Sequence, residues 1–165
     1  MLAISEDEIK ALLPIEECIN SMEQAFMDWG NSAATNMPRY RLPLKNGALQ
    51  VMAGSSAEQE VTGLKTYATG GNEGTQMIVL LYSTLTGKPI AILNSNILGQ
   101  IRTGAASGLA TKYLTADTQK TVTIIGSGFQ AETQLSAVTS VREINKAFVY
   151  SRNKINRENF AKKMS

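Results

Sequence analysis

A glycine turn between an apolar run and a helical pattern carries the clearest chemical signal in this sequence. The run Thr121–Ile125 has the composition of a strand buried on both faces, and Gly126 permits the tight turn that follows it. Gly128 lets the backbone approach a bound pyrophosphate, and Ala131, in the place of a third glycine, is small enough for close packing of a helix on the strand. The pattern predicts a phosphate cradle for a dinucleotide at the N-terminus of a helix over 129–141. An ordinary glycine turn of an α/β domain is the alternative interpretation.

The residues after the next predicted strand, 146–150, are expected to select the dinucleotide. An acidic residue there would accept a hydrogen bond from the ribose 2′-hydroxyl of NAD, but the sequence has Ser151-Arg152-Asn153-Lys154. Two cations suit a 2′-phosphate, which Arg152 can hold in charge-assisted hydrogen bonds. NADP(H) is therefore the preferred cofactor, and NAD(H) remains possible. The same residues are also typical of a solvated basic turn with Asn153 or Ser151 as the N-cap of a helix, and both interpretations can hold together.

Hydrophobic spacing predicts the elements that position these residues. Apolar residues at helical spacing predict helices, and short apolar runs between turn residues predict strands. The expected helices are a short one opened by a capping box at 5–8, then 15–30, 97–114, 129–141 and 156–165. The expected strands are 49–53, 63–68, 76–83, 89–93, 121–125 and 146–150. Strand residues 77–81 and 89–93 are expected to pair as a hairpin, and 31–37 to form a loop before an extended, proline-bounded stretch with Arg39 and Arg41.

The order of these elements predicts an α/β fold in two parts. An α+β domain over 1–116 is followed by the first part of a Rossmann-type parallel-sheet domain over 117–165. From Thr121 onward only 45 residues follow, enough for two strands and two helices, whereas a dinucleotide fold has about six strands. We therefore expect a fragment or a truncated reading frame.

Composition excludes several classes of function. The 165 residues are 43% hydrophobic and 18% charged, with a net charge of +2, as in a globular domain. Seven basic and two acidic residues fall in 142–165, but no nucleic-acid module is recognisable, so no nucleic-acid partner is expected. The single cysteine, Cys18, excludes an internal disulfide and is expected in the core. No apolar run approaches the ~20 residues of a membrane helix, and we expect a cytoplasmic location and no metal site.

Four motifs occur together along the chain. They are Arg39 four residues before Pro43, Lys65 in a strand, Ile101-Arg102-Thr103-Gly104-Ala105-Ala106, and Ile125-Gly126-Ser127-Gly128-Phe129-Gln130-Ala131. With these motifs in this order, the sequence resembles the ornithine cyclodeaminase/mu-crystallin family. The resemblance covers the whole chain but only about the first half of a family member.

The resemblance implies an NAD(P)-dependent enzyme that acts at the α-carbon of an amino acid or on a cyclic imine. Family members convert ornithine to proline with release of ammonia, or act as amino-acid dehydrogenases or ketimine reductases. Their N-terminal part binds substrate and forms a homodimer, and a Rossmann domain follows. The alternatives are a non-catalytic, crystallin-like protein that binds cofactor and ligand, and an inactive remnant that only dimerises.

The resemblance also assigns residues by position. Arg39, Lys65 and Arg102 would bind the substrate carboxylate, and Lys65 would be catalytic by sharing that anion or moving protons. Taken alone, each of these cations is more typical of a solvated surface. The implied cofactor-binding residues are Thr103, Gly126, Ser127, Gly128, Phe129, Gln130, Ala131, Ser151, Arg152, Asn153 and Asn156.

The sequence departs from the family pattern at three places. Asn94-Ser95 stands where relatives carry Asp-Gly, and Met52-Ala53 where they carry Met-Pro. The family's catalytic aspartate would fall beyond Ser165, and no histidine is present to replace it near neutral pH. We therefore expect this chain alone to be inactive.

Overall fold

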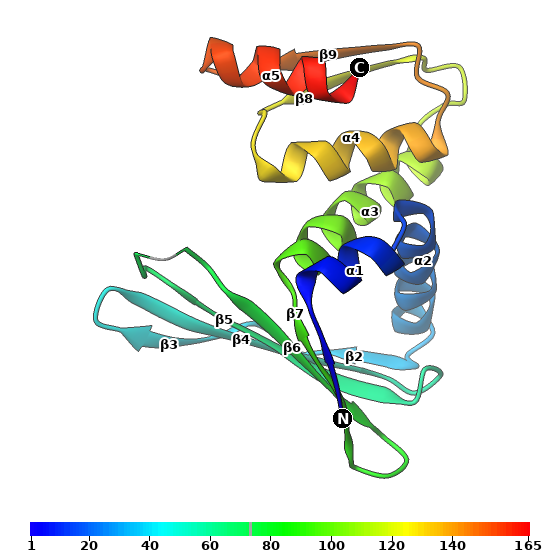
Figure 1. Ribbon diagram of the computed structural model, residues 1–165. Coiled ribbons are helices and arrows are strands. Elements are labelled where there is room, and N and C mark those ends of the chain that lie inside the picture. Colours follow the sequence, from blue (N-terminus) through cyan, green and yellow to red (C-terminus); the bar gives the residue numbers. More distant parts are fainter. Residues whose placement is uncertain (73) are drawn as a thin grey trace. The chain divides into compact units, whose positions relative to one another are not determined.

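The chain forms a mixed α/β fold with one large and one small sheet (Figure 1). The computed structural model describes residues 1–72 and 74–165. The larger sheet combines parallel and antiparallel strands, and the smaller sheet is parallel. This is the fold class that the sequence predicts.

Two compact units share the chain. One contains residues 1–12 and 24–98, and the other contains 13–23 and 99–165. Helices α2 (Ile15–Gly30) and α3 (Asn96–Leu114) each contribute residues to both units, so neither unit is continuous in sequence. The functional boundary at 116/117 that the sequence predicts differs from this division and stays a prediction.

The first unit is built on a seven-stranded sheet with the strand order β1-β7-β6-β5-β4-β2, in which β3 also pairs with β4. The strands are β1 (Leu2–Ile4), β2 (Ala34–Asn36), β3 (Tyr40–Leu44), β4 (Gly47–Ser56), β5 (Val61–Thr69), β6 (Met77–Ser83) and β7 (Pro89–Asn94). The predicted hairpin is confirmed, with Leu80 opposite Ile92. The loop expected over 31–37 is partly wrong, because Ala34–Asn36 pairs with β4 and satisfies backbone groups that a bare edge would leave open.

The N-terminal segment of the first unit caps the N-terminus of α3. Strand β1 pairs in parallel with β7, and α1 (Glu6–Leu12) follows it. The predicted capping box is confirmed, because the Ser5 N–H and hydroxyl both donate to the Glu8 carboxylate, at 2.8 and 2.7 Å. The Glu6 carboxylate accepts hydrogen bonds from the Asn96 and Ile97 N–H groups, at 2.7 and 2.8 Å. A residue 90 positions away therefore caps α3, where the helix dipole favours negative charge.

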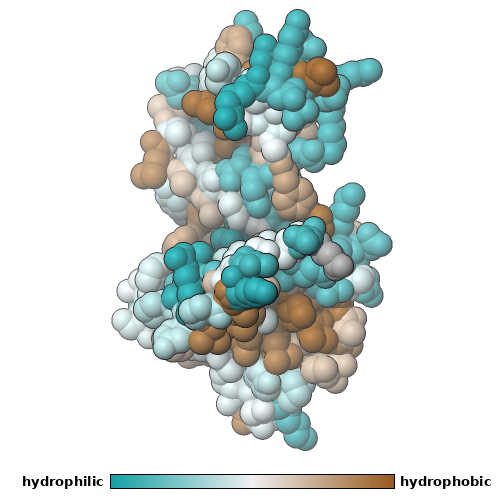
Figure 2. Space-filling model, turned by 90° about the vertical axis from the view of Figure 1, so that its left-hand side faces the viewer, coloured by the Kyte–Doolittle hydropathy of each residue, from teal (hydrophilic) through white to brown (hydrophobic). Residues whose placement is uncertain are grey.

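One face of the large sheet carries exposed apolar side chains. Directly paired residues of neighbouring strands lie on the same face, which places Leu42, Leu49 and Ala68 together and Val51, Thr66 and Ile78 together. Leu42 is 46% exposed and Ile78 is 39% exposed. Figure 2 shows hydrophobic side chains gathered on this part of the molecule.

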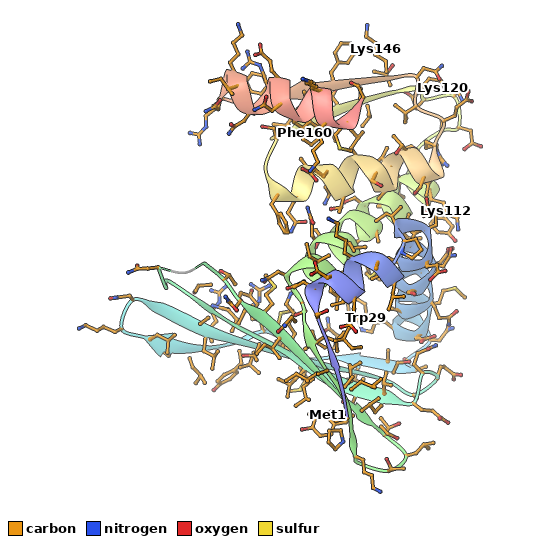
Figure 3. The ribbon with its side chains drawn as sticks, viewed as in Figure 1. Met1, Trp29, Lys112, Lys120, Lys146 and Phe160 are labelled. Atoms are coloured by element: carbon orange, nitrogen blue, oxygen red, sulfur yellow. The ribbon has the colours of Figure 1, made fainter. Side chains whose placement is uncertain are left out.

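The second unit contains a βαβ arrangement, as predicted. Its elements are β8 (Thr121–Ile125), α4 (Phe129–Val141), β9 (Lys146–Tyr150) and α5 (Lys154–Met164), and β8 pairs in parallel with β9. Helix α5 begins two residues before the expected position, because the Asn153 side chain accepts from the Asn156 N–H and caps it there. Ala131, Leu135 and Phe160 form the core under the strands, and Figure 3 labels Phe160 on α5.

Cys18 is buried, as the sequence predicts. The side chain of Trp29, near the end of α2, is 55% exposed.

Candidate functional site

The glycine turn has the backbone geometry of an anion cradle. Gly126 has a φ of +110°, which favours glycine, and its N–H donates to the Tyr150 carbonyl at 2.7 Å. Gly128 is the N-cap of α4, and no side chain caps the first turn of that helix. A Cβ on either glycine would meet no atom within 4 Å. The turn therefore leaves the positive end of α4 open to a ligand phosphate.

A hollow of about 500 Å³ lies at this turn. It is lined by Thr123, Ile124, Ile125, Gly126, Gly128, Phe129, Gln130, Ala131 and Gln134. The lining includes five of the six residues from Gly126 to Ala131 that the family resemblance assigns to the cofactor. These residues fit the pyrophosphate of a dinucleotide, because they offer backbone N–H groups and no side-chain carboxylate.

The sixth residue, Ser127, joins the glycine turn to the turn after β9. Its hydroxyl donates to the Ser151 hydroxyl at 2.9 Å, and Ser151 donates in turn to the Asn153 carbonyl at 3.0 Å. The Asn153 side-chain oxygen accepts from the Asn156 N–H at 3.0 Å. The side-chain oxygens of Ser151 and Asn153 therefore already accept hydrogen bonds from neighbouring residues, whereas the Arg152 side chain is exposed.

Helix α3 packs closely on α4 and so connects its own residues to the glycine turn. A Cβ on Gly104 would lie 2.4 Å from the Thr133 carbonyl oxygen, and one on Gly108 would lie 2.8 Å from the Ala137 carbonyl oxygen. The buried Gln100 donates its side-chain amide to the carbonyl of Phe129, the first residue of α4. Glycine at positions 104 and 108 therefore permits the close packing of α3 on α4.

Arg102 and Thr103 lie in the middle of this helix. Arg102 is exposed, and the Thr103 hydroxyl donates to the Gly99 carbonyl at 2.6 Å while its own carbonyl accepts from the Gln134 amide. Arg102 is near Cys18, whose thiol has its pKa raised by burial and lowered to a smaller extent by the Arg102 charge. Arg102 and the glycine turn belong to the same compact unit.

Lys65 lines a hollow in the first unit. The hollow has a volume of about 360 Å³ and is lined by Asn36, Met52, Ala53, Gly54, Ser55, Ser56, Val61, Gly63, Leu64, Lys65, Val79 and Leu81. Lys65 pairs across the sheet with Met52 and Val79, and its Nζ lies 5.3 Å from the centre of the Tyr67 ring. Among the described residues that line the hollow, Lys65 alone carries a charge.

Arg39 lies in the link between β2 and β3, which both pair with β4. Asn36 is opposite Gly54 and Tyr40 is opposite Val51, so the link runs beside Met52. Since Met52 pairs with Lys65, Arg39 is two strands away from the lysine. Arg39 and Lys65 belong to the first unit and Arg102 to the second, so a carboxylate site shared by all three stays a prediction.

The sequence comparison settles the family. The ornithine cyclodeaminase/mu-crystallin family matches residues 2–165. The chain belongs to this family. The family resemblance inferred from the four motifs is thus confirmed.

Individual relatives in the family are reductases and dehydrogenases. The Δ1-pyrroline-2-carboxylate reductase of Bacillus thuringiensis subsp. konkukian is 36% identical over 161 residues, which are 92% of this chain and 49% of that protein. The Δ1-pyrroline-2-carboxylate reductase of Thermococcus litoralis, solved with NADH and L-proline, superposes with a TM-score of 0.92 at 35% identity, covering 100% of this chain and 54% of that one. An archaeal alanine dehydrogenase dimer with bound NAD has a TM-score of 0.93 at 27% identity, over 99% and 52% of the two chains. This chain therefore spans about half the length of these family relatives.

The described residues were also compared with the requirements of a metal cluster and of a membrane-spanning helix. Among residues 1–72 and 74–165, no three His, Cys, Asp or Glu side chains gather where they could hold a metal ion. None of the described helices combines the length and apolar character needed to cross a membrane. The basic side chains at the end of the chain contribute to local pairs, such as Lys163 with Glu132 at 2.6 Å.

Sequence reasoning missed two residues of the second unit, Gln100 and Arg157, and it missed the contact between Ser127 and Ser151. Gln100 ties α3 to the glycine turn, Ser127 ties that turn to Ser151, and Arg157 donates to the Ser151 carbonyl at 2.9 Å. Ser127 was assigned to the cofactor by position only. No local pattern indicates these contacts, because each joins residues from different elements.

Proposed function

We propose that this chain forms the substrate- and cofactor-binding part of an NAD(P)H-dependent reductase of a small cyclic imine carboxylate, such as Δ1-pyrroline-2-carboxylate. The observation that carries the proposal is the hollow around Lys65, whose described lining residues are otherwise uncharged. The relatives named Δ1-pyrroline-2-carboxylate reductase support it, including the structure solved with NADH and L-proline.

The lining of the hollow favours a ring over a diamino acid. A pyrroline ring presents only methylene groups beyond its imine and carboxylate, and Val61, Val79 and Leu81 can pack against them. Ornithine would bring a second ammonium group, which needs a carboxylate or several acceptors once it leaves water. No described residue that lines the hollow is acidic. We therefore favour imine reduction over cyclodeamination as the reaction of this site.

The residues of the chain would bind the anion and supply a proton. Reduction of an imine adds a hydride to carbon and a proton to nitrogen, and a bound reduced nicotinamide supplies the hydride. Lys65 would hold at Nζ the proton that the nitrogen takes up, and solvent would replace that proton. Arg39, which belongs to the same unit as Lys65, would hold the carboxylate through paired N–H donors, and the role assigned to Arg102 stays a prediction.

NADP(H) is the cofactor that the turn after β9 favours. Ribose binding in NAD needs an acceptor for the 2′-hydroxyl, but the Ser151 hydroxyl already accepts a hydrogen bond from Ser127 and the Asn153 side-chain oxygen already accepts one from the Asn156 N–H. The exposed Arg152 offers only donors, which suit a phosphate. The solved relatives bind NADH or NAD, so this preference would distinguish the chain from them.

We also propose that the chain forms a homodimer through the first unit, in the cytoplasm. The apolar sheet face with Leu42 and Ile78 supports this, because a face of this kind gains stability when another protein surface covers it. The archaeal alanine dehydrogenase relative is a dimer. Light scattering of the 165-residue chain would give twice the monomer mass if the proposal is right, and Leu42→Lys should shift the mass to that of a monomer.

Nucleotide titration tests the cofactor part of the proposal. The 165-residue chain is titrated with NADPH and with NADH by nucleotide fluorescence, while circular dichroism reports that it is folded. We expect saturable binding with NADPH ahead of NADH. A folded chain that binds neither nucleotide would refute the proposal.

Substrate titration tests the choice of ligand. L-Proline, the product, is added to the NADPH-bound chain, and L-ornithine and L-alanine are added in parallel. We expect proline to give a saturable fluorescence change that Lys65→Met abolishes, while Lys45→Met, a change at an exposed lysine of the same unit, leaves it intact. Tighter binding of ornithine than of proline would overturn the imine assignment.

A further inference from the structure

Arg157 reaches back from α5 to the strand end that precedes the helix. It is half-buried, and its Nη1 donates to the Ser151 carbonyl at 2.9 Å, six residues earlier in the chain. Ser151 is the residue before Arg152. The guanidinium of Arg157 therefore holds the backbone from which the Arg152 side chain projects.

The other polar atoms of this turn are already engaged. The Ser151 hydroxyl bonds with Ser127 and with the Asn153 carbonyl, and the Asn153 side chain caps α5. Arg157, on α5, adds its own hydrogen bond to the Ser151 carbonyl to these contacts. It also places a positive charge on a carbonyl oxygen whose negative dipole end would otherwise oppose an anion bound at the turn.

We propose that Arg157 is a positioning and specificity-determining residue for the 2′-phosphate of NADP(H). The inference rests on the proposed function and concerns a residue that the family resemblance does not assign. Arg157 fixes the Ser151–Asn153 backbone so that Arg152 meets the phosphate, and its own charge adds to the attraction. NADH lacks the phosphate, so its affinity does not depend on this charge.

A purely structural role for Arg157 predicts a different outcome. If the guanidinium only stabilised the first turn of α5, its loss would weaken both nucleotides equally and lower the unfolding temperature. If only net charge mattered, removal of any cation on this helix would have the same effect. Lys162 offers the matched control, because it is an exposed cation in the last turn of α5, away from the turn after β9.

The experiment compares the 165-residue chain with Arg157→Gln, Arg157→Lys, Lys162→Gln and Arg152→Ala. Each is titrated with NADPH and NADH by fluorescence, and each is melted by circular dichroism. We expect Arg157→Gln to weaken NADPH about fivefold, as for a partly exposed charge pair, and to change NADH by less than about twofold. Arg157→Lys should restore part of the NADPH affinity, and Lys162→Gln should leave it within about twofold of the parent.

The outcomes separate this inference from the proposed function. Equal losses for NADPH and NADH, equal effects of Arg157→Gln and Lys162→Gln, or no effect of Arg157→Gln would each overturn the role of Arg157. If Arg152→Ala weakens NADPH and Arg157→Gln does not, only the role of Arg157 fails. A parent chain without preference for NADPH refutes the cofactor assignment, and the role of Arg157 with it.

Discussion

The close crossing of α3 and α4 gives a stability prediction whose size follows from distances. A Cβ added at Gly104 would lie 2.4 Å from the Thr133 carbonyl oxygen, whereas ordinary contacts begin at 3.4 Å, so the shortfall is 1.0 Å. The same subtraction at Gly108, with 2.8 Å to the Ala137 carbonyl oxygen, gives 0.6 Å. Both contacts are with backbone atoms, so the helices must move apart to accept a methyl group.

Two opposing terms set the expected cost. Overpacking of this kind costs about 1–3 kcal/mol, and replacing glycine within a helix returns about 1 kcal/mol. We expect Gly104→Ala to lower the free energy of unfolding by about 2 kcal/mol and Gly108→Ala by about 1 kcal/mol. For a chain of this length, 2 kcal/mol corresponds to a fall of about 4–8 °C in the unfolding temperature.

Thermal and urea unfolding followed by circular dichroism would measure both variants. Gly30→Ala is the control, because Gly30 is the last residue of α2 and a Cβ there would meet no atom within 4 Å. Its stability should stay within about 0.5 kcal/mol of the parent. If Gly104→Ala were as stable as the parent, the steric reasoning would be refuted, since the crossing would then accept a methyl group without cost.

Three further predictions concern single side chains. Arg142→Met should lower the free energy of unfolding by about 2–3 kcal/mol in urea titration, because its side chain, 12% exposed, donates to the carbonyls of Lys112, at the end of α3, and Thr115, just after it, at 2.7 and 3.0 Å. The pKa of the Glu8 carboxylate is lowered mainly by the hydrogen bond from the Ser5 backbone N–H and then by that from the Ser5 hydroxyl. The charge of Glu8 therefore stabilises the fold above its unfolded pKa, and this stabilisation is lost as the pH falls. Glu8→Gln should flatten the decline of the melting temperature below about pH 5, and an unchanged profile would contradict this. Ser95→Ala should keep or raise the melting temperature, because the buried Ser95 hydroxyl has no hydrogen-bond partner among the described residues; a clear loss of stability would show a partner for it.

The second unit was predictable because its elements are defined by local patterns. The bounds of α4 and β9 agree with the sequence-based ones, since an apolar run, a glycine turn and a helical period leave little choice. The position of Gly126 with positive φ also follows from residue type. The turn predicted as a phosphate cradle therefore has the predicted backbone geometry, and the residues assigned to the cofactor stay a prediction.

The remaining features depend on partners distant in sequence. Strand β1 is only three residues long and exists because β7 pairs with it, and Glu6 caps a helix that starts 90 residues later. The contact of Arg157 with Ser151 depends on the exact start of α5, which was expected two residues later. Such contacts leave no periodic signal, so a single sequence does not reveal them.

The discontinuity of both units has a consequence for synthesis on the ribosome. Strand β1 and Glu6 are made first, but their partners β7 and the start of α3 are made about 90 residues later, so the first unit cannot close until α3 begins to emerge. Residues 13–23 are likewise made long before the rest of their unit, which is residues 99–165. Closing such long loops is slow, and the apolar strands β4 to β6 stay unprotected meanwhile. During translation this chain should therefore depend on chaperones more than a protein of the same size with local contacts.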